Sequence, residues 1–429
     1  MDEEQQFLRA IIEGRDEPGD LTRRLVFADW LEEQGDPRAE YVRLYMKHRE
    51  ILAAPERTDL RLELADILDR LSRQSVNLAS LQEAFPGIED TAAVFYPTAK
   101  PRAEFIRVQC ELAGDADLPR ERREDLLARE RDLLTAHRDE WAEPLRELAA
   151  ANIGFSRGLP GSMTIHAEYF LQNADAIFAT APIRKARISV LEGIDDLLAS
   201  SHLRGLNALS LSSNCLGRTC LRALAQSPNV SNLEELDLSN NHFGDASVAE
   251  LAASEHLGNL KTLILTDTGI SGQGARTVLD SEHLAGVTAL GLSYNRFGDD
   301  GLEQLATSPN LARLKSLRVN GCSIGDAGVR SLTDSEHTGS LERLGLCGNA
   351  LTDEGARFLS EAWNLAGLNE LDVRGNLITD QGARLLANPE NMPNLAQIDL
   401  QSERIGPSCA AQVNEILASR RKGRSPGGA

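Results

Sequence analysis

The sequence predicts an α/β solenoid, with a parallel concave sheet and convex helices, preceded by an α-helical N-terminal region. Three observations support this prediction. An apolar pattern recurs every 27 residues, the pattern joins a strand period to a helix period, and the charge density falls after residue 150. A strand and a helix of this length cannot bury themselves alone, so stacked neighbours must share one core.

Composition indicates an ordinary soluble protein and excludes some partners. Of 429 residues, 41% are hydrophobic and 26% are charged. The 45 Lys and Arg against 65 Asp and Glu give a formal charge of −20, so we expect no nucleic acid partner. Residues 1–150 hold 34 acidic and 22 basic residues, and the remaining 279 hold only 31 and 23. This contrast predicts two different regions.

The start of the chain is acidic, whereas a signal peptide needs a basic segment. No stretch approaches the ~18 apolar residues of a membrane helix. The six cysteines contain no C-x-x-C pair and no disulfide framework. We therefore expect a cytoplasmic monomer with free thiols and no membrane contact.

Residues 1–150 are predicted to form a charged α-helical region, because apolar residues recur there at helical spacing. One part reads Arg24-Leu-Val-Phe-Ala-Asp-Trp-Leu and ends as Pro37-Arg-Ala-Glu-Tyr-Val-Arg-Leu44. Residues 5–47 closely resemble the repeat-companion domain, a segment that precedes repeats in some bacterial proteins. The resemblance implies an architecture and no enzymatic activity.

The ending of this motif recurs 64 residues later, as Pro101-Arg-Ala-Glu-Phe-Ile-Arg-Val108. This second copy, near residues 101–112, lacks the Ala-Asp-Trp-Leu half, so we expect it to be degenerate or interrupted. In the first copy we expect Trp30 to anchor a small helical core. Asp29 is expected to cap a helix or to pair with an arginine.

Residues 119–150 keep helical spacing and are expected to form one long helix or two. Residues 151–205 are predicted to be an N-terminal cap with irregular repeats. In it, a strand over 155–165 precedes a helix over about 167–179. The end of a solenoid must be covered, because its core would otherwise be open to water.

Residues 206–419 carry the regular repeats. The pattern L-x-x-L-x-L-x-x-N begins in constant phase at Leu206, Leu233, Leu260, Val287, Leu314, Leu341, Leu368 and Leu395. It resembles the leucine-rich repeat family, and within it the longer subtype typified by ribonuclease inhibitor. The resemblance implies a curved solenoid with its strands on the concave side. The basic tail, residues 420–429, is predicted to be disordered.

Columns of equivalent residues support this interpretation. Counted from the first residue of a repeat, positions +3 and +5 alternate with polar residues, as a half-buried strand requires. Position +8 is mostly Asn, which in the family bonds the adjacent turn. Position +12 is Asp in five repeats and is suited to cap a helix: Asp245, Asp299, Asp326, Asp353 and Asp380. Glu403 and Pro407 depart from these columns and indicate the last repeat.

The exposed strand positions +4 and +6 are the expected binding surface, because their side chains point out of the sheet. We expect Ile264 and Tyr294, the latter at +7, to form an apolar anchor. Arg318, Arg374 and Asp372 are expected to form a charged patch. The candidate partner-binding residues are Asp237, Ile264, Tyr294, Arg318, Asn320, Asp372 and Arg374. Alternatively, small residues simply line a tightly curved surface.

Two patterns that suggest chemistry have structural explanations. Gly321-Cys322-Ser323-Ile324-Gly325 matches the nucleophile elbow of hydrolases, but each of its residues occupies a repeat column. The nearest comparable histidine, His242, is three repeats away, on the order of 14 Å at ~4.8 Å per strand. We therefore expect no catalytic residue.

A histidine column at position +23 suggests a metal site: His202, His256, His283 and His337. Asn229, Asn310, Asn364 and Asn391 share this column, and Asn is a poor metal ligand. Asn and His both tolerate the left-handed conformation, so a helix-to-strand turn explains the column. Phosphate-binding motifs are also absent, so we expect neither a metal nor a cofactor.

These observations favour a non-catalytic protein-interaction or scaffold module. We expect an unidentified protein partner on the concave face. One alternative is a structural or regulatory repeat protein that acts through its helical N-terminal region. Another is a GTPase-activating regulator, as some proteins with this type of repeat are, but no exposed Arg is singled out for that role.

Overall fold

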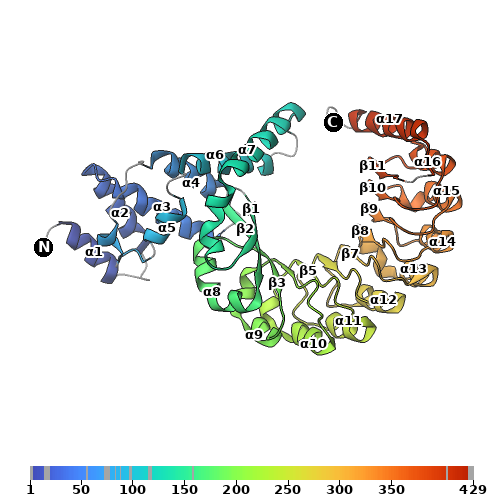
Figure 1. The fold of residues 1–429 in the computed structure, drawn as a ribbon, viewed down its shortest axis with the longest axis horizontal. Coiled ribbons are helices and arrows are strands. Elements are labelled where there is room, and N and C mark those ends of the chain that lie inside the picture. Colours follow the sequence, from blue (N-terminus) through green and yellow to red (C-terminus); the bar gives the residue numbers. More distant parts are fainter. Residues whose placement is uncertain are drawn as a thin grey trace. The chain divides into compact units, whose positions relative to one another are not determined.

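The computed structural model describes residues 3–13, 20–54, 57–71, 78–82, 84–86, 88–95, 99–114, 118–156, 159–401 and 404–423. The chain divides into two compact units, Met1–Lys185 and Ala186–Ala429. The first is largely helical, and the second alternates strands with helices (Figure 1). The predicted fold class is therefore confirmed.

The first unit consists of helices followed by a hairpin and one more helix. Its elements are α1 Glu3–Glu13, α2 Asp20–Glu33, α3 Arg38–Ala53, α4 Thr58–Arg70, the 3-10 turn η1 Ala79–Leu81, α5 Ile88–Phe95, α6 Ala99–Gly114, α7 Arg120–Arg146, β1 Ala151–Ser156, β2 Leu159–His166 and α8 Ala167–Thr180. Residues 119–150 thus contain one long helix. The strand expected over 155–165 is instead part of an antiparallel hairpin, in which Phe155 pairs with Pro160.

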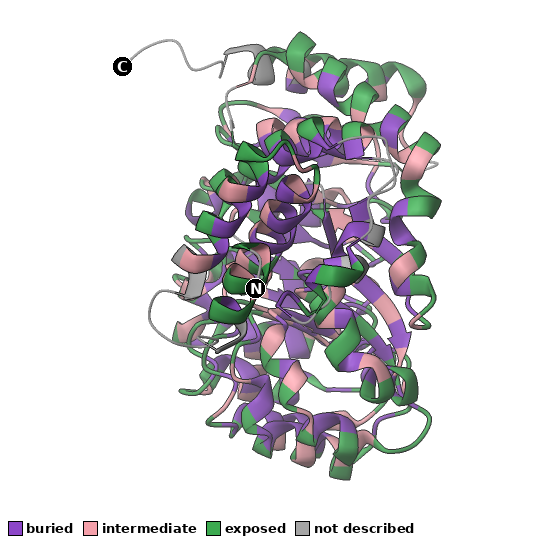
Figure 2. Cartoon of the chain, turned by 90° about the vertical axis from the view of Figure 1, so that its left-hand side faces the viewer, coloured by how far each residue is buried: buried purple, intermediate pink, exposed green. Residues whose placement is uncertain are grey.

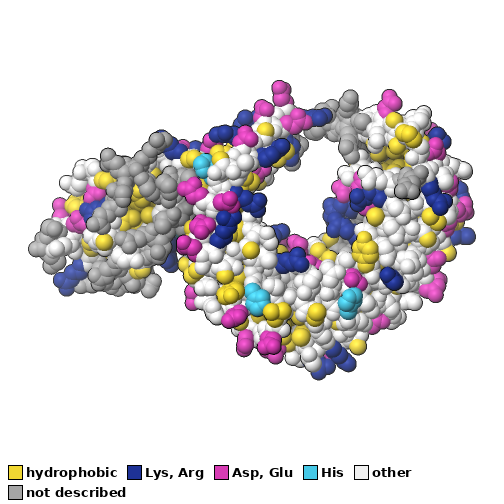
Figure 3. Space-filling model, in the orientation of Figure 1, with side chains coloured by type: hydrophobic (Ala, Val, Ile, Leu, Met, Phe, Trp, Pro, Cys, Tyr) yellow, Lys and Arg dark blue, Asp and Glu magenta, His cyan; other side chains and the backbone are white. Residues whose placement is uncertain are grey.

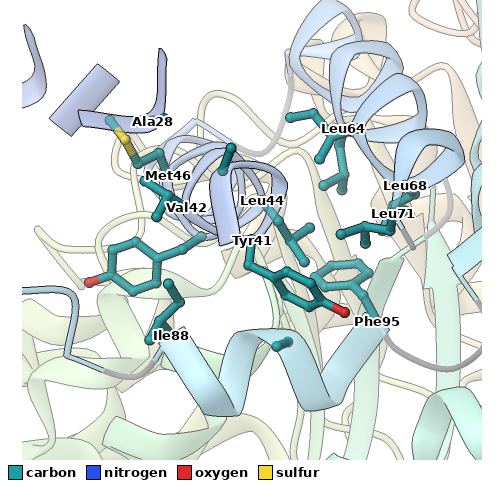
Figure 4. Close-up of a cluster of buried hydrophobic side chains, with 14 of the residues drawn as sticks. Ala28, Tyr41, Val42, Leu44, Met46, Leu64, Leu68, Leu71, Ile88 and Phe95 are labelled. Carbon is teal, nitrogen blue, oxygen red and sulfur yellow. The ribbon is translucent and has the colours of Figure 1, made fainter. Parts of the chain in front are cut away.

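The core of the first unit is built around α3. Figure 4 shows Leu44 and Tyr41 of α3 near Leu64 and Leu68 of α4 and Phe95 of α5. All five side chains are at most 4% exposed. Because α3 presents apolar residues to several neighbouring helices, it anchors this core.

The second unit repeats a short strand, a turn and a helix. Its strands are β3 Lys185–Ser189, β4 Ala208–Ser210, β5 Glu235–Asp237, β6 Thr262–Ile264, β7 Ala289–Gly291, β8 Ser316–Arg318, β9 Arg343–Gly345, β10 Glu370–Asp372 and β11 Gln397–Asp399. Its helices are α9 Ile194–Ala199, α10 Arg218–Gln226, α11 Gly244–Ala252, α12 Gly272–Asp280, α13 Gly298–Ala306, α14 Asp326–Asp334, α15 Asp353–Glu361, α16 Asp380–Ala387 and α17 Pro407–Gly423. Short 3-10 turns, η2 Ser201–Gly205, η3 Pro228–Val230, η4 Pro309–Arg313 and η5 Trp363–Leu365, follow some of the helices.

Strands β4 to β11 pair in parallel and in register, so equivalent residues of successive repeats stack. Leu236, Leu263 and Leu290 are register partners and are at most 2% exposed. The strands line the inner side of the curved unit and the helices line its outer side (Figure 1). Figure 2 shows helices that are exposed on their outward faces and buried toward the interior.

Buried asparagines connect neighbouring turns, as the resemblance implied. Oδ1 of Asn295 accepts hydrogen bonds from the backbone N–H groups of Thr268 and Gly269, both at 3.0 Å. Its Nδ2 donates to the Leu265 and Leu292 carbonyls at 2.7 and 2.9 Å. Backbone groups that a buried turn would leave unpaired are thereby satisfied.

The aspartate column acts between repeats. Asp353 accepts hydrogen bonds from the backbone N–H and the hydroxyl of Thr379, at 2.8 and 2.6 Å, at the start of the following helix. Gly382 N–H also donates to it at 3.0 Å. A Cβ on Gly382 would lie 2.5 Å from Asp353 Oδ1, so glycine leaves room for this contact. The Asp was expected to cap a helix, and it caps the helix of the next repeat.

The last repeat ends in α17, which extends to Gly423 and begins at Pro407, where other repeats have Asp. Proline is well suited to the first turn of a helix, because the N–H that it lacks has no partner there. Residue 403 and residues 424–429 lie outside the described residues. The first four positions of the tail predicted to be disordered therefore belong to a helix.

Candidate functional site

Asp237 marks the N-terminal part of the concave face, and internal hydrogen bonds already occupy its carboxylate. Ser210 Oγ donates to Oδ2 at 2.8 Å from the neighbouring strand. Ser239 donates to Oδ1 through its hydroxyl at 2.5 Å and its backbone N–H at 3.0 Å. Asp237 thus stabilises the sheet surface, and few acceptor positions remain for a partner.

Tyr294 is the most exposed aromatic residue of this face. Its side chain is 59% exposed, and its backbone is left-handed, with φ of +60°. A Cβ on Gly321 would lie 2.6 Å from Tyr294 Cδ1, so the ring lies on Gly321 of the next repeat. This direction is away from the repeat of Ile264, whose methyl group lies over Gly291. Ile264 and Tyr294 thus belong to neighbouring repeats, and the Ile264 methyl group leans toward the repeat of Tyr294.

Arg318 and Asn320 come from the same strand region and have different roles. The Arg318 side chain is exposed and, among the described residues, makes no ion pair or hydrogen bond. Asn320 Oδ1 accepts from Cys347 N–H at 2.8 Å, so this side chain connects two repeats. Both approach Gly345, where a Cβ would lie 2.9 Å from Asn320 Oδ1.

Asp372 and Arg374 form a two-point ion pair. Arg374 Nε and Nη2 donate to the two carboxylate oxygens at 2.9 and 2.7 Å. This pairing raises the pKa of the Arg374 guanidinium above its usual range. The expected charged patch therefore contains a neutralised pair and Arg318, which has no ion pair with any residue that the structure describes.

The sequence prediction missed Arg343. It is the first residue of β9, at position +2 of its repeat. Because side chains alternate along a strand, position +2 faces the same side as +4 and +6. The Arg343 guanidinium is exposed and, within the described part of the chain, has no ion pair. Extending the period-two pattern by one step would have found it. Figure 3 shows Lys and Arg side chains gathered on the inner face near β8 to β10.

A shallow cavity of about 320 Å³ lies at the C-terminal end of this face. Arg374, Asp399 and Gln401 give it a polar side, and Ile405 and Val413 give it an apolar one. It continues the concave surface beyond the Asp372–Arg374 pair.

The elbow-like motif is part of the repeat architecture. Asn349 Oδ1 accepts from the backbone N–H groups of Cys322 and Ile324 at 3.0 and 3.1 Å. Cys322 is fully buried, and burial raises the pKa of its thiol to about 11. Ser323 is exposed on the turn, with φ of +63°. The motif thus takes part in the hydrogen bonds by which buried asparagines connect successive turns.

The histidine column lies in helix-to-strand turns, as expected, but not for the expected reason. None of its members has a positive φ. Instead, Ser254 and Ser335 hydroxyls accept from the backbone N–H groups of His256 and His337, both at 3.2 Å. In the described ranges, no cluster of His, Cys, Asp and Glu could hold a metal.

In the first unit, Trp30 and Asp29 have the structural roles that we expected. Trp30 lies 5.5 Å from Phe7 and 6.0 Å from Phe27, measured between ring centroids. Asp29 pairs with Arg43 of α3 at 2.8 Å. These contacts join α1, α2 and α3.

The second copy of the N-terminal motif does contain its first half. Arg61-Leu-Glu-Leu-Ala-Asp-Ile-Leu-Asp69 on α4 is equivalent to Arg24-Leu-Val-Phe-Ala-Asp-Trp-Leu-Glu32 on α2. The first halves of the two copies are 37 residues apart in the sequence, whereas their endings are 64 residues apart. The second copy is therefore interrupted by 27 extra residues, which include α5. Ile67 in place of Trp30 concealed the match.

Equivalent contacts support this assignment. Arg24 and Arg61 are both buried and donate to distant backbone carbonyls, at 2.7 and 2.9 Å. Arg107 pairs with Asp66 at 2.7 Å, as Arg43 pairs with Asp29. The first unit therefore contains two related helix pairs, and the expectation that this half is missing was wrong.

The first unit also has a cavity of about 690 Å³, the size of a small-molecule or side-chain pocket. Tyr45, His48 and Arg49 of α3 line it with Pro144 and Phe178. Burial lowers the pKa of His48 to about 4, so the imidazole is neutral at pH 7. Arg49 is exposed, and its guanidinium lies 5.7 Å from the Tyr45 ring centroid.

The second unit is thus a solenoid of stacked strand–turn–helix repeats with an open concave face. A family model described as leucine-rich repeat matches residues 231–252, 287–306, 313–332 and 368–387. Each matched segment contains a strand and residues of the helix that follows it. The chain therefore contains leucine-rich repeats.

Comparison with curated proteins found no match. Among solved structures, the chain is similar to one from the complex of Rad7 and Elc1 in yeast. That similarity has 16% identity and a TM-score of 0.34, over 80% of this chain and 91% of the other. The tropomodulin C-terminal domain of Caenorhabditis elegans has 15% identity and a TM-score of 0.27, over 41% and 93%.

All six cysteines are free thiols. In the described part of the chain, no helix combines the length and the apolar character needed to cross a membrane.

Proposed function

We propose that this chain is a non-catalytic interaction module that binds a protein partner on the concave face between β6 and β10. One observation carries the proposal. Tyr294 and Arg318 project from this face; the fold leaves the ring largely exposed, and no described residue pairs with the guanidinium. Aromatic and Arg side chains are the residues that most often dominate the energetics of interfaces.

The side chain at position 294 supports the same proposal. A left-handed conformation is unfavourable for a bulky residue, whereas three following repeats have glycine at the equivalent position, Gly321, Gly348 and Gly375. Nothing in the packing of the repeat requires an aromatic side chain there, because the ring is exposed. The three preceding repeats also have non-glycine residues in this conformation, Ser213, Asn240 and Asp267, so the turn sets the backbone. The choice of an exposed aromatic ring at this position is what supports a binding role.

A site-specific crosslinking experiment tests this proposal. Full-length protein carrying a photoreactive phenylalanine at position 294 is expected to crosslink one partner in lysate from the source organism. The same label at Phe358, on the outer helix α15, is the matched control and should give no product. Labelling only at 358 would contradict a concave site.

Point variants then measure the energetic contribution. Tyr294→Ala and Arg318→Ala should each weaken binding of that partner at least tenfold, about 1.4 kcal/mol. The melting temperature should change little, because both side chains are exposed. Unchanged affinity in both variants would move the site elsewhere.

The second candidate is that the first unit makes the functional contact. The cavity of about 690 Å³ near His48 favours it. A photoreactive label at Phe178, which lines this cavity, distinguishes the two candidates. Crosslinking at 178 and not at 294 would support the helical unit.

We also propose finer assignments for both units. The 27-residue period and the helix in every full repeat support the subtype typified by ribonuclease inhibitor. The paired helices of residues 5–47, with their interrupted second copy, support the repeat-companion domain.

A further inference from the structure

The outward side chains of the concave face change in charge along the solenoid. From β4 to β7, positions +2, +4 and +6 contain no Lys or Arg, and β5 contributes Glu235 and Asp237. From β8 to β10 the same positions contain three arginines, Arg318, Arg343 and Arg374, and two acidic residues, Glu370 and Asp372. On β3 the equivalent positions are Lys185 and Arg187. A cluster of three arginines, with a net formal charge of +1 (3 − 2) over these positions, therefore lies on β8 to β10 of a chain whose formal charge is −20.

The arginines of this cluster differ in their availability. Asp372 binds Arg374 at two points, so this guanidinium is neutralised. Arg318 and Arg343 make no ion pair with any described residue, although Glu370 is the register partner of Arg343. A partner carboxylate could bind either guanidinium without breaking an internal contact. Guanidinium and carboxylate groups match in a bidentate geometry, which adds both energy and orientation.

The outward residues of β9 between these arginines have small or no side chains, and neighbouring side chains cover them. Gly345 and Gly348 belong to β9 and its turn, and the stem of Arg318 lies on Gly345, 3.3 Å from the site of a Cβ. Tyr294 is on one side of this strip and the Asp372–Arg374 pair is on the other. An extended segment could therefore lie across the Arg318 stem and the Asn320 amide, with an apolar side chain against the exposed Tyr294 ring.

We propose that the concave face over β8 to β10 binds an extended acidic segment of a protein partner, whose carboxylates pair with Arg318 and Arg343. The inference rests on the proposed concave-face function and specifies the chemistry of the partner. A short acidic segment fits better than a nucleic acid. A nucleic acid would bring closely spaced phosphates along its whole length against a strongly acidic protein.

The test uses the full-length protein and defined probes. A fluorescein-labelled 12-residue peptide with six Glu and a central Leu is compared, by anisotropy, with the same peptide carrying Gln at every Glu position. We expect the Glu peptide to bind at least tenfold more tightly in 50 mM NaCl, and this preference should shrink in 300 mM NaCl. Equal binding of the two peptides would overturn the proposal.

A matched pair of double variants separates the local patch from the total charge. Arg318→Gln/Arg343→Gln removes the two free guanidinium groups and should weaken the Glu peptide at least tenfold. Arg187→Gln/Arg204→Gln removes the same charge from exposed positions on β3 and η2, and should change the affinity less than twofold. Equal losses in the two double variants would contradict the proposal, as would equally tight binding of a 12-nucleotide single-stranded DNA.

The outcome is distinguishable from failure of the proposed function. If the partner still crosslinks at position 294 in the Arg318→Gln/Arg343→Gln variant, the concave face binds a partner and the acidic segment is wrong. If the Glu peptide binds as expected but no partner crosslinks at 294, the basic patch is real and the proposed function fails.

Discussion

At the scale of single residues, side chains of the same type have different roles, depending on whether a neighbouring residue already binds them. Arg374 is held by Asp372, whereas Arg318 is free among the described residues. Asn320 and Asp237 were expected to face a partner, but each accepts hydrogen bonds that hold the sheet surface together. Tyr294, Arg318 and Arg343 are therefore the side chains of this face that remain available to a partner.

His48 gives a pH-dependent prediction at this scale. Burial lowers its pKa to about 4, below the 6.5 of an exposed histidine. The unfolded chain therefore binds a proton between these pH values that the folded unit does not, so stability falls as the pH decreases. From pH 7 to pH 5 this group should cost the first unit about 2 kcal/mol.

Urea unfolding at the two pH values measures this cost. In a Trp363→Phe background, fluorescence reports only Trp30 and Trp141 of the first unit. His48→Gln lacks the titrating group and should lose about 2 kcal/mol less than the parent over this pH range. An equal pH dependence in both proteins would show that the acid sensitivity comes from other groups.

At the scale of elements, each repeat is completed by its neighbour. The buried asparagines connect the turns of neighbouring repeats by hydrogen bonds, and each aspartate at position +12 caps the helix of the next repeat. The short helices are therefore stabilised mainly by contacts between repeats, since isolated helices of this length are unstable in water.

Asp353→Ala tests this connection. The change leaves the Thr379 and Gly382 N–H groups without their acceptor and should reduce the free energy of unfolding by about 2 kcal/mol. Asp300→Ala is the matched control, because Asp300 is exposed on α13 and contributes only a helix-dipole term of about 0.5 kcal/mol. Chemical denaturation would reveal the difference, and similar losses in both variants would argue against a link between repeats.

At the scale of the whole molecule, the chain contains two compact units of different construction. The first has a core of aromatic and aliphatic side chains between non-equivalent helices. The second stacks equivalent leucines in register, so its stability is expected to depend on neighbouring repeats.

Leu290→Ala on β7 tests how far a local defect extends. Leu290 is 2% exposed, and its truncation should cost about 3 kcal/mol. Hydrogen exchange should show loss of protection in β6, β7 and β8 and unchanged protection in residues 20–54. Leu191→Ala, at a side chain that is 85% exposed, should change neither region. Lost protection across the first unit would mean that the two units unfold together.

The amino-acid sequence by itself determined the solenoid, because a 27-residue period fixes which residues stack and which faces are buried. It also located the concave face and five helix-capping aspartates. The same period-two alternation places Arg343 at the outward position +2. Local pattern is sufficient here because each repeat contacts its neighbours in the same way.

Only the tertiary structure decided which of those residues remain available. Whether a guanidinium is paired depends on a side chain that the fold brings beside it, as Asp372 is brought to Arg374 and not to Arg318. The interrupted second motif and the His48 cavity likewise depend on contacts between residues far apart in the chain. A periodic sequence specifies stacking, but pairing and burial in the non-periodic unit arise from three-dimensional packing alone.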